Sequence, residues 1–309
     1  MIISASRRTD VPAFYAKWFM NRICEGFCTV PNPFNPKQIS RISLKPEDVD
    51  VIIFWTRHAR PLLPFLNELN ERGHRYYFLY TLMKNPRVLE PKSPSHERSL
   101  KTFRELADRL GREKVVWRYD PIVFSTITDA NFHKETYHRI AEELKGYTSR
   151  SIISVVDMYR KTAKRLRLLE DQGICITEST KENLGVLMKS LAASAGANGM
   201  EIQTCAEKPD HSLHGIPQGK CIDDGLIRKV FGIDVTRQKD PSQRSDCRCV
   251  PSRDIGMYDT CRFGCVYCYA TSSMALARKR HGNCNLTSPS LTGRYENDKV
   301  IENPHCERI

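Results

Sequence analysis

The sequence predicts an α/β fold, a partial (βα)6 barrel of the TIM type, followed by a cysteine-rich C-terminal segment. Short apolar runs rich in β-branched and aromatic residues alternate with amphipathic stretches of helical period. Several of these runs are apolar on both faces, which is typical of parallel strands covered by helices on one side and by a packed interior on the other. A doubly wound sheet would show the same alternation. The first run, however, leads into "SASRRTD", which lacks the glycine fingerprint of a nucleotide-binding Rossmann fold, so the barrel is favoured.

The elements are expected in regular alternation along the first two thirds of the chain. The predicted strands cover residues 1–6, 49–56, 75–82, 114–120, 150–157 and 199–205. The predicted helices cover residues 12–25, 61–72, 97–110, 130–144, 158–171 and 181–195. Gly73, Gly111 and Gly199 stand where a helix must end before the next strand begins. Two proline-rich stretches, 30–38 and 84–97, are predicted to be loops over the strand ends.

Length and composition are those of a globular protein. The chain has 309 residues, of which 40% are hydrophobic and 27% charged, so neither wholesale disorder nor a fibrous repeat is expected. No apolar run reaches membrane-spanning length, and the N-terminus lacks the pattern of an export signal, so a cytoplasmic protein without membrane contact is expected. The predicted domains are a barrel over residues 1–205 and a cysteine-rich segment over 206–309, packed on the face where the strands end.

The net charge of +12 predicts attraction to anionic partners, among which nucleic acid and phosphorylated metabolites are candidates. One concentrated patch is "MYRKTAKRLRLL", in the predicted helix 158–171, where basic and apolar residues alternate at helical spacing. A solvated helix face is favoured here over a nucleic-acid footprint.

Polar residues directly follow several of the apolar strands. In a barrel or a doubly wound sheet, ligands gather at the carboxyl ends of the strands. Arginines and aspartates at such positions are costly unless they are paired or used, so a functional pocket is favoured over a rim of ion pairs. The candidate catalytic residues at these ends are Arg7, Arg8, Asp10, Arg118 and Asp120.

Twelve cysteines in a reducing compartment point to metal binding or redox chemistry rather than to disulfides. Cys261, Cys265 and Cys268 have the spacing C-x3-C-x2-C, and three such thiolates can hold a [4Fe-4S] cluster with one iron left open. Gly264 allows the tight turn that a loop around a cluster needs, and Tyr267 offers a ring to pack on a ligand. The alternative is a zinc site completed by His281 or Cys284, in a basic RNA-binding protein without catalysis.

A second set of cysteines is predicted to form a closed site. Four thiolates complete the ligand set of either an auxiliary [4Fe-4S] cluster or a structural zinc, and the iron-sulfur cluster is favoured. The predicted ligands are Cys205, Cys221, Cys247 and Cys249. Cys284 and Cys306 are expected to bind no cluster of their own.

The pattern C-x3-C-x-aromatic-C resembles the signature of the radical S-adenosylmethionine (radical SAM) enzymes. That resemblance implies a partial barrel and an open iron that chelates the amino and carboxylate groups of S-adenosylmethionine. It also implies reductive cleavage of this cofactor to a 5'-deoxyadenosyl radical that abstracts hydrogen from a substrate, with electrons from a reductant such as flavodoxin or ferredoxin. The substrate itself is not implied.

Nearly the whole chain resembles a bacterial family, the domain of unknown function 1848, which has a radical-SAM-like cysteine cluster at its C-terminus. The stretches that carry the likeness are "ISASRRTDVPAFY", "NPFNPKQISRISL", "VDVIIFWT", "VVWRYDP", "GYTSRSIISVVDMY", "QTCAE", "GKCIDD" and "DIGMYDTCRFGCVYCYA". Two departures are "TRHARP" where Lys-Asn-Pro is expected, and the absence of the Gly-Gly-Glu stretch that grips the methionine amino group in radical SAM enzymes.

Roles for the site residues follow from the two resemblances. Tyr267, Ser154 and the other strand-end residues would bracket the adenosyl group. Arg118 would pair with a carboxylate of S-adenosylmethionine or of the substrate through a bidentate fork, and Asp120 would accept ribose hydroxyls. The N-terminal group of Arg7, Arg8 and Asp10 would contact the substrate.

Overall fold

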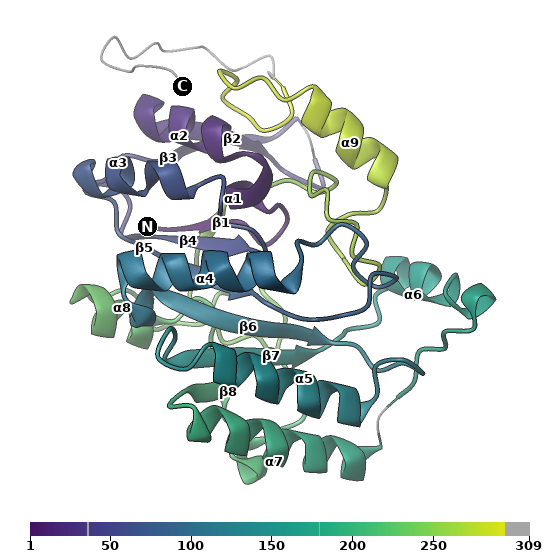
Figure 1. Ribbon diagram of the computed structural model, residues 1–309. Coiled ribbons are helices and arrows are strands. Elements are labelled where there is room, and N and C mark those ends of the chain that lie inside the picture. Colours follow the sequence, from purple (N-terminus) through teal and green to yellow (C-terminus); the bar gives the residue numbers. More distant parts are fainter. Residues whose placement is uncertain (36, 179, 294–309) are drawn as a thin grey trace. The chain divides into compact units, whose positions relative to one another are not determined.

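The computed structural model describes residues 1–35, 37–178 and 180–293, and its fold is α/β (Figure 1). All six predicted strands form, and they lie in one eight-stranded sheet with the order β10-β1-β4-β5-β6-β7-β8-β9. Their bounds are β1 (Ile2–Ala5), β4 (Val51–Thr56), β5 (Tyr76–Thr81), β6 (Val115–Ile122), β7 (Arg150–Val155) and β8 (Glu201–Cys205), with the short β9 (Gln218–Gly219) and β10 (Arg253–Asp254) at the edges.

The strand order agrees with a barrel-type sheet. From β1 to β8 the neighbours follow one another in chain order, whereas a doubly wound sheet reverses its order at a switch point. The pairs β10–β1, β1–β4, β6–β7, β7–β8 and β8–β9 are all parallel. The expected parallel α/β architecture, consistent with a TIM-like barrel, is therefore confirmed.

The predicted helices form close to the expected positions. Their bounds are α1 (Val11–Phe14), α2 (Ala16–Glu25), α3 (Leu66–Glu71), α4 (His96–Leu110), α5 (Ala130–Glu143), α6 (Arg160–Arg167) and α7 (Lys181–Ala197). Ser95 and Asp129 begin α4 and α5 by accepting a backbone N–H of the first turn, from Arg98 at 3.3 Å and from Phe132 at 2.8 Å. Gly111 ends α4 with a φ of +88°, which few other residues adopt.

Besides the short β9 and β10, two strands and two helices in the described residues were not predicted from the sequence. The stretch 30–38, predicted to be a loop, joins the strands of an antiparallel pair, β2 (Phe27–Pro31) and β3 (Ile39–Ser43), and its first two residues belong to β2. Pro31 is tolerated because it is the last residue of its strand. Two helices were also missed, α8 (Asp224–Phe231) and α9 (Met274–Gly282). None of the helices in the described ranges combines the length and apolar character needed to cross a bilayer.

The chain forms two compact units. Unit 1 contains residues 1–78, 252–264 and the described part of the chain from 270 onward. Unit 2 contains residues 79–251 and 265–269. The division at residue 205 that the sequence suggested remains a prediction.

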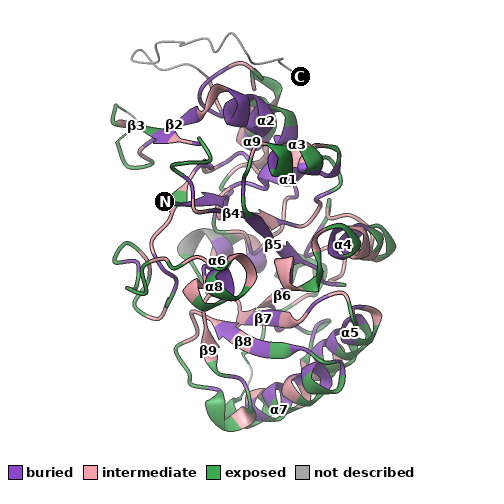
Figure 2. Ribbon diagram, turned by 90° about the vertical axis from the view of Figure 1, so that its left-hand side faces the viewer, coloured by how far each residue is buried: buried purple, intermediate pink, exposed green. Residues whose placement is uncertain are grey.

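Each unit has an aromatic core. In unit 1, Phe54 of β4 stacks on Phe78 with ring centroids 4.9 Å apart and meets Phe19 of α2 edge-on at 5.4 Å. In unit 2, α5 and α7 lie side by side and turn their buried faces inward (Figure 2). Trp117 of β6 stacks there on Tyr137 of α5 at 4.6 Å. Such ring pairs add about 0.5–1.5 kcal/mol each beyond the burial of their area.

Candidate metal and cofactor sites

The structure brings the side chains of four predicted cysteine ligands together in unit 2. Cys205 is the last residue of β8, and its Sγ lies 3.0 Å from the Sγ of Cys221, which follows β9. The Cys221 thiol also forms a hydrogen bond with Cys249, and Cys249 with Cys247. We call Cys205, Cys221, Cys247 and Cys249 the four-cysteine cluster.

Three cysteines of the four-cysteine cluster are buried, and Cys205 is half-buried. Cys221 and Cys249 are 1% and 2% exposed. The Cys221 thiol donates a hydrogen bond to the Cys205 sulfur, and this bond, its hydrogen bond with Cys249 and burial raise the pKa of Cys221 well above its usual value. The pKa of Cys247 is raised in the same way by Cys249 and by burial. Four converging thiols fit a thiophilic cation, whose binding would release their protons.

The Sγ atoms of Cys205 and Cys221 lie closer together than two ligands of one metal ion would. Among the described residues, no three or more His, Cys, Asp and Glu side chains are spaced to hold a metal ion. Two thiolates on one tetrahedral zinc lie about 3.8 Å apart, given Zn–S bonds of about 2.3 Å. The 3.0 Å contact of Cys205 and Cys221 would therefore open by less than about 1 Å to accept zinc, and further to accept a cubane cluster.

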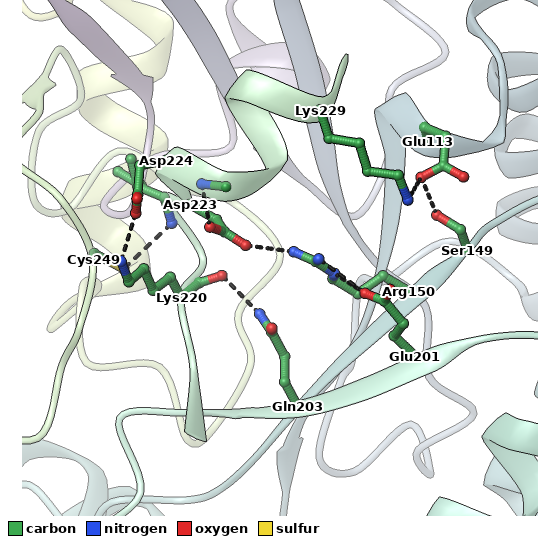
Figure 3. A network of polar contacts seen from close by, with 12 residues as sticks. Glu113, Ser149, Arg150, Glu201, Gln203, Lys220, Asp223, Asp224, Lys229 and Cys249 are labelled. Atoms are coloured by element: carbon green, nitrogen blue, oxygen red, sulfur yellow. Dashed lines mark hydrogen bonds and ion pairs between the residues drawn. The ribbon is translucent and has the colours of Figure 1, made fainter. Parts of the chain in front are cut away.

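A polar network fixes the segment that carries Cys221 (Figure 3). Gln203 of β8 donates through Nε2 to the carbonyl of Lys220 at 2.7 Å, and the Lys220 ammonium pairs with Asp224 at 2.5 Å. The backbone N–H of Ile222 donates to the Cys249 sulfur at 3.3 Å. At the start of β7, Arg150 pairs with Asp223, the N-cap of α8, at 2.5 Å. The loop and α8 are thus fastened to the sheet beside the four-cysteine cluster.

Gly219 is required for this packing. A Cβ at this position would lie 2.1 Å from Cδ of Gln203, so the Gln203 side chain would have to leave and lose its hydrogen bond to Lys220. We expect Gly219→Ala to lower the free energy of unfolding by about 1–3 kcal/mol in urea titrations. Gly196→Ala in α7 is the control, because no atom lies within 4 Å of its Cβ, and it should stabilise by about 1 kcal/mol. Equal effects of the two substitutions would contradict the steric argument.

An ion pair lies beside the four-cysteine cluster. Arg118 and Asp120 of β6 are in direct contact, and their side chains are 14% and 13% exposed. Burial alone would lower the pKa of Arg118, but the negative charge of Asp120, with those that Cys221, Cys205 and Tyr269 carry when ionised, outweighs it and raises that pKa. The guanidinium therefore stays charged within electrostatic reach of two of the cluster sulfurs. Ser154, in the neighbouring strand β7, is half-buried.

Glu207 is a strand-end residue outside the set of candidate catalytic residues that the sequence predicts. It follows β8, and its Oε1 accepts the backbone N–H of Val155 at 2.9 Å. Burial raises its pKa to about 7, and the charges of Asp120 and Asp246 add to the rise. Unit 2 therefore gathers a cation, two carboxyl groups and four thiols around the ends of β6, β7 and β8.

The segment 265–269 of the C-x3-C-x2-C loop is held by two other parts of unit 2. The Val266 N–H donates to the carbonyl of Leu89 at 3.1 Å, and Val266 packs on the apolar cluster that contains Leu89 and Leu166. Arg165 of α6 donates through Nε to the carbonyl of Val266 at 2.9 Å and through Nη2 to that of Cys268. The basic helix predicted as a solvated face thus uses one of its arginines to hold the cysteine loop.

The two tyrosines of this segment have different surroundings. Tyr267 is 7% exposed, and its hydroxyl donates to the carboxylate of Glu90, which is itself buried. Tyr269 is 42% exposed, and its ring centroid lies 5.9 Å from that of Tyr159. The assignment of Tyr267 to the adenosyl group stays a prediction, whereas Tyr269 is the ring that solvent reaches.

The three cysteines of the C-x3-C-x2-C motif are half-buried and are not joined in disulfides. In unit 2 the Cys268 N–H donates to the Cys265 carbonyl at 3.1 Å, a tight turn that follows Gly264 with its φ of +74°. Cys261 belongs to unit 1. That these three thiols hold a metal cluster together remains a prediction.

The residues of the zinc alternative lie with Cys261 in unit 1. Burial raises the pKa of Tyr15, and the nearby thiols of Cys284 and Cys261 raise it further. His281 packs on the Tyr15 ring at 5.3 Å, and its Nδ1 lies 3.3 Å from Nη1 of Arg262. Burial lowers the pKa of His281, as does the Arg262 charge, and both favour the neutral ring. Cys306 lies outside the described residues.

The N-terminal candidates make structural contacts in unit 1. Arg7 donates to the Ser252 hydroxyl at 3.3 Å, and its guanidinium lies over the Trp55 ring at 5.5 Å. The Arg8 guanidinium lies over the Tyr258 ring at 5.2 Å. Both guanidinium groups thus lie over aromatic rings, and a role of the two arginines in substrate binding remains a prediction.

Asp10 is buried at the junction of β1, α1 and β4. It caps α1 by accepting the Ala13 N–H at 3.0 Å, and it also accepts from the Thr56 hydroxyl and from the Arg57 N–H, both at 2.7 Å. Burial raises the pKa of Asp10 to about 7, although these hydrogen bonds and the Arg57 charge oppose the rise. The "TRHARP" stretch is thus tied to Asp10 through the backbone of Arg57.

This raised pKa predicts a pH-dependent stability. The unfolded carboxyl ionises near pH 4, and the folded one only near pH 7, so stability falls as pH rises from 4 to 7 and is level above. A difference of about 3 pH units corresponds to about 4 kcal/mol. Urea titrations at pH 4, 5.5, 7 and 8 should show this loss as the difference between the wild type and Asp10→Asn. The same slope in both proteins would mean that Asp10 does not titrate in this range.

Comparisons with known proteins identify the family. No match was found among curated proteins. Two structures of a D-hydantoinase from Bacillus sp. AR9 are similar at 12% and 11% identity, with TM-scores of 0.29 and 0.26, and the matches cover 66% and 61% of this chain. They cover 41% and 36% of those chains, so this chain spans less than half of their length. A family model matches residues 2–270, and the chain therefore belongs to the family described as Domain of unknown function (DUF1848).

Proposed function

We propose that this protein is a radical SAM-like iron-sulfur enzyme. The observation that best supports the proposal is the held cysteine loop: three half-buried cysteines on one short stretch, part of whose backbone is fixed by Arg165 and by the Leu89 carbonyl. A [4Fe-4S] cluster on Cys261, Cys265 and Cys268, with S-adenosylmethionine and an electron from a flavodoxin or ferredoxin, supplies reductive cleavage to a 5'-deoxyadenosyl radical.

The chain's own residues have separable tasks in this proposal. Arg118 stays charged because Asp120 and the cluster sulfurs surround it, and it would bind a carboxylate of S-adenosylmethionine or of the substrate. Asp120 uses its Oδ2 for Arg118, while Oδ1 makes no hydrogen bond or ion pair within the described ranges and would accept a ribose hydroxyl. Glu207, in the same polar group, would hold or accept a proton close to neutral pH.

The four-cysteine cluster would hold an auxiliary [4Fe-4S] cluster or a zinc ion. Its burial suits a closed site, because no sulfur of Cys221, Cys247 or Cys249 is open to a substrate. Arg118 would place a fixed positive charge beside the bound metal and offset part of the charge of the thiolates.

The test is an anaerobic preparation. We expect a brown protein with iron and sulfide, which forms 5'-deoxyadenosine when mixed with S-adenosylmethionine and dithionite. Cys265→Ala should abolish that product and leave the metal of the four-cysteine cluster in place. A colourless zinc protein would overturn the enzyme proposal. A brown protein that gives no 5'-deoxyadenosine would reduce it to an electron carrier or a structural cluster.

A second candidate is a metal-stabilised, basic RNA-binding protein without catalysis. It is favoured by the net charge of +12 and by the presence of His281 and Cys284 in the same unit as Cys261. Salt-dependent retention on RNA, together with one zinc per C-x3-C-x2-C loop, would support it. Retention that does not change between 50 and 300 mM salt would exclude it, because phosphate contacts release counterions.

A further inference from the structure

Two exposed aromatic rings in unit 2 face the same solvent region. Tyr159 lies between β7 and α6 and is 41% exposed, and Tyr269 directly follows the last cysteine of the loop and is 42% exposed. Their ring centroids are 5.9 Å apart, and the ring planes are tilted by 45°. Met158, next to Tyr159, is 54% exposed. Large apolar groups gathered at one solvent-exposed point commonly mark a binding site.

A charged pair lies within reach of these rings. The strand β6, which carries Arg118 and Asp120, pairs with β7, and Tyr159 follows the last residue of β7 by four positions. Arg118 in turn contacts Oδ2 of Asp120. The region therefore offers flat apolar faces, a fixed cation and a carboxylate oxygen. A nucleoside presents the matching groups, namely a planar base, ribose hydroxyls and an anionic substituent.

The contacts of Tyr267 strengthen the case for Tyr269. The Tyr267 ring is almost fully buried, and its hydroxyl is taken up by Glu90, which also accepts from the Asn85 amide at 2.8 Å. The Tyr267 ring therefore stabilises the loop and exposes little surface on which a ligand could stack. Tyr269, one residue beyond Cys268, has its face in solvent and its loop fixed by Arg165.

We propose that Tyr159 and Tyr269 form a stacking site for a nucleobase, with Asp120 accepting a ribose hydroxyl and Arg118 facing the anionic group. The inference rests on the proposed function only in expecting a nucleoside ligand. Two sources share this chemistry, the adenosine of S-adenosylmethionine and a nucleotide substrate. The net charge of +12 is compatible with either, because both ligands can carry an anionic group.

Binding measurements test this site without any turnover. The probes are S-adenosylhomocysteine and 5'-AMP, titrated calorimetrically into the anaerobically purified protein. Stacking on one ring contributes about 1–3 kcal/mol per base, so Tyr159→Leu and Tyr269→Leu should each weaken binding about 5- to 150-fold. Tyr269→Phe keeps the ring and should bind within about threefold of the wild type. Phe34→Leu is the control, because Phe34 is an exposed ring, at 92%, between β2 and β3.

The outcomes separate this inference from the proposed function. Weakened binding of S-adenosylhomocysteine alone assigns the site to the cofactor, and weakened binding of 5'-AMP assigns it to a nucleotide substrate. Unchanged affinities in both leucine variants, or a wild type that binds neither probe, would overturn the inference. A protein that binds these probes through the two tyrosines but forms no 5'-deoxyadenosine would contradict only the proposed reaction.

Discussion

Cys221→Ala should remove the metal of the four-cysteine cluster and destabilise the protein strongly. The Cys221 sulfur contacts both Cys205 and Cys249, so its loss breaks the ligand set at its centre. A metal present at about 1,000 times its Kd stabilises the folded state by about 4 kcal/mol, and the variant loses that contribution. The measurements are metal and sulfide per chain and the free energy of unfolding, each before and after chelation.

Cys28→Ala is the matched control for this prediction. Cys28 is also a fully buried thiol, and burial raises its pKa to about 12, but it lies in β2 with no other cysteine in contact among the described residues. Its replacement leaves a cavity of the same size, at a cost of about 1 kcal/mol, and should leave the metal content unchanged. Equal losses in the two variants would mean that Cys221 acts only by filling space. A Cys205–Cys221 disulfide in the protein purified without oxygen would also contradict the prediction.

The same preparation distinguishes zinc from an iron-sulfur cluster. In a background where Cys261, Cys265 and Cys268 are all replaced by alanine, any remaining metal belongs to the four-cysteine cluster. Iron with equimolar sulfide and a brown colour would agree with the iron-sulfur interpretation of the sequence. Zinc without colour would agree with the short approach of the Cys205 and Cys221 sulfurs.

The strands were predictable because their signal is local and strong. Runs such as 51–56 are apolar on both faces, and the structure buries nearly all of their side chains. The β2–β3 pair was missed because its prolines read as loop residues, although Pro31 needs no ladder N–H at the end of its strand. The strands β9 and β10 contain two residues each, too few for any periodicity to show.

The grouping of the cysteines was predictable from the sequence, whereas the hydrogen bonds that side chains make to the backbone around them were not. The four scattered cysteines were grouped from their number and chemistry, and the structure places their side chains in contact. The role of Arg165 was not predictable, because its acceptors are the carbonyls of Val266 and Cys268, which leave no mark in the sequence. Likewise, no spacing rule decides which of Tyr267 and Tyr269 is buried in an irregular loop.

Arg165→Met should loosen the C-x3-C-x2-C loop and weaken its binding of iron, although Arg165 lies far before this loop in the sequence. The guanidinium is the only group among the described residues that bonds the carbonyls of both Val266 and Cys268. Each charge-assisted bond to a carbonyl contributes about 1.5–3 kcal/mol, so we expect at least a tenfold loss of 5'-deoxyadenosine formation and a lower iron content. Arg165→Lys keeps the charge but cannot donate to two carbonyls from a planar fork, so it should rescue only part of the loss.

Arg167→Met is the control on the same helix. Arg167 is exposed at the end of α6, so its replacement removes the same charge without touching the cysteine loop. It should leave iron content and product formation within about twofold, since exposed charges contribute about 0–1 kcal/mol. If Arg165→Met kept its iron and its rate, the loop would be fixed by the Leu89 carbonyl and the apolar contacts of Val266 instead. If Arg167→Met failed as well, the net charge of α6 rather than the two hydrogen bonds would be responsible.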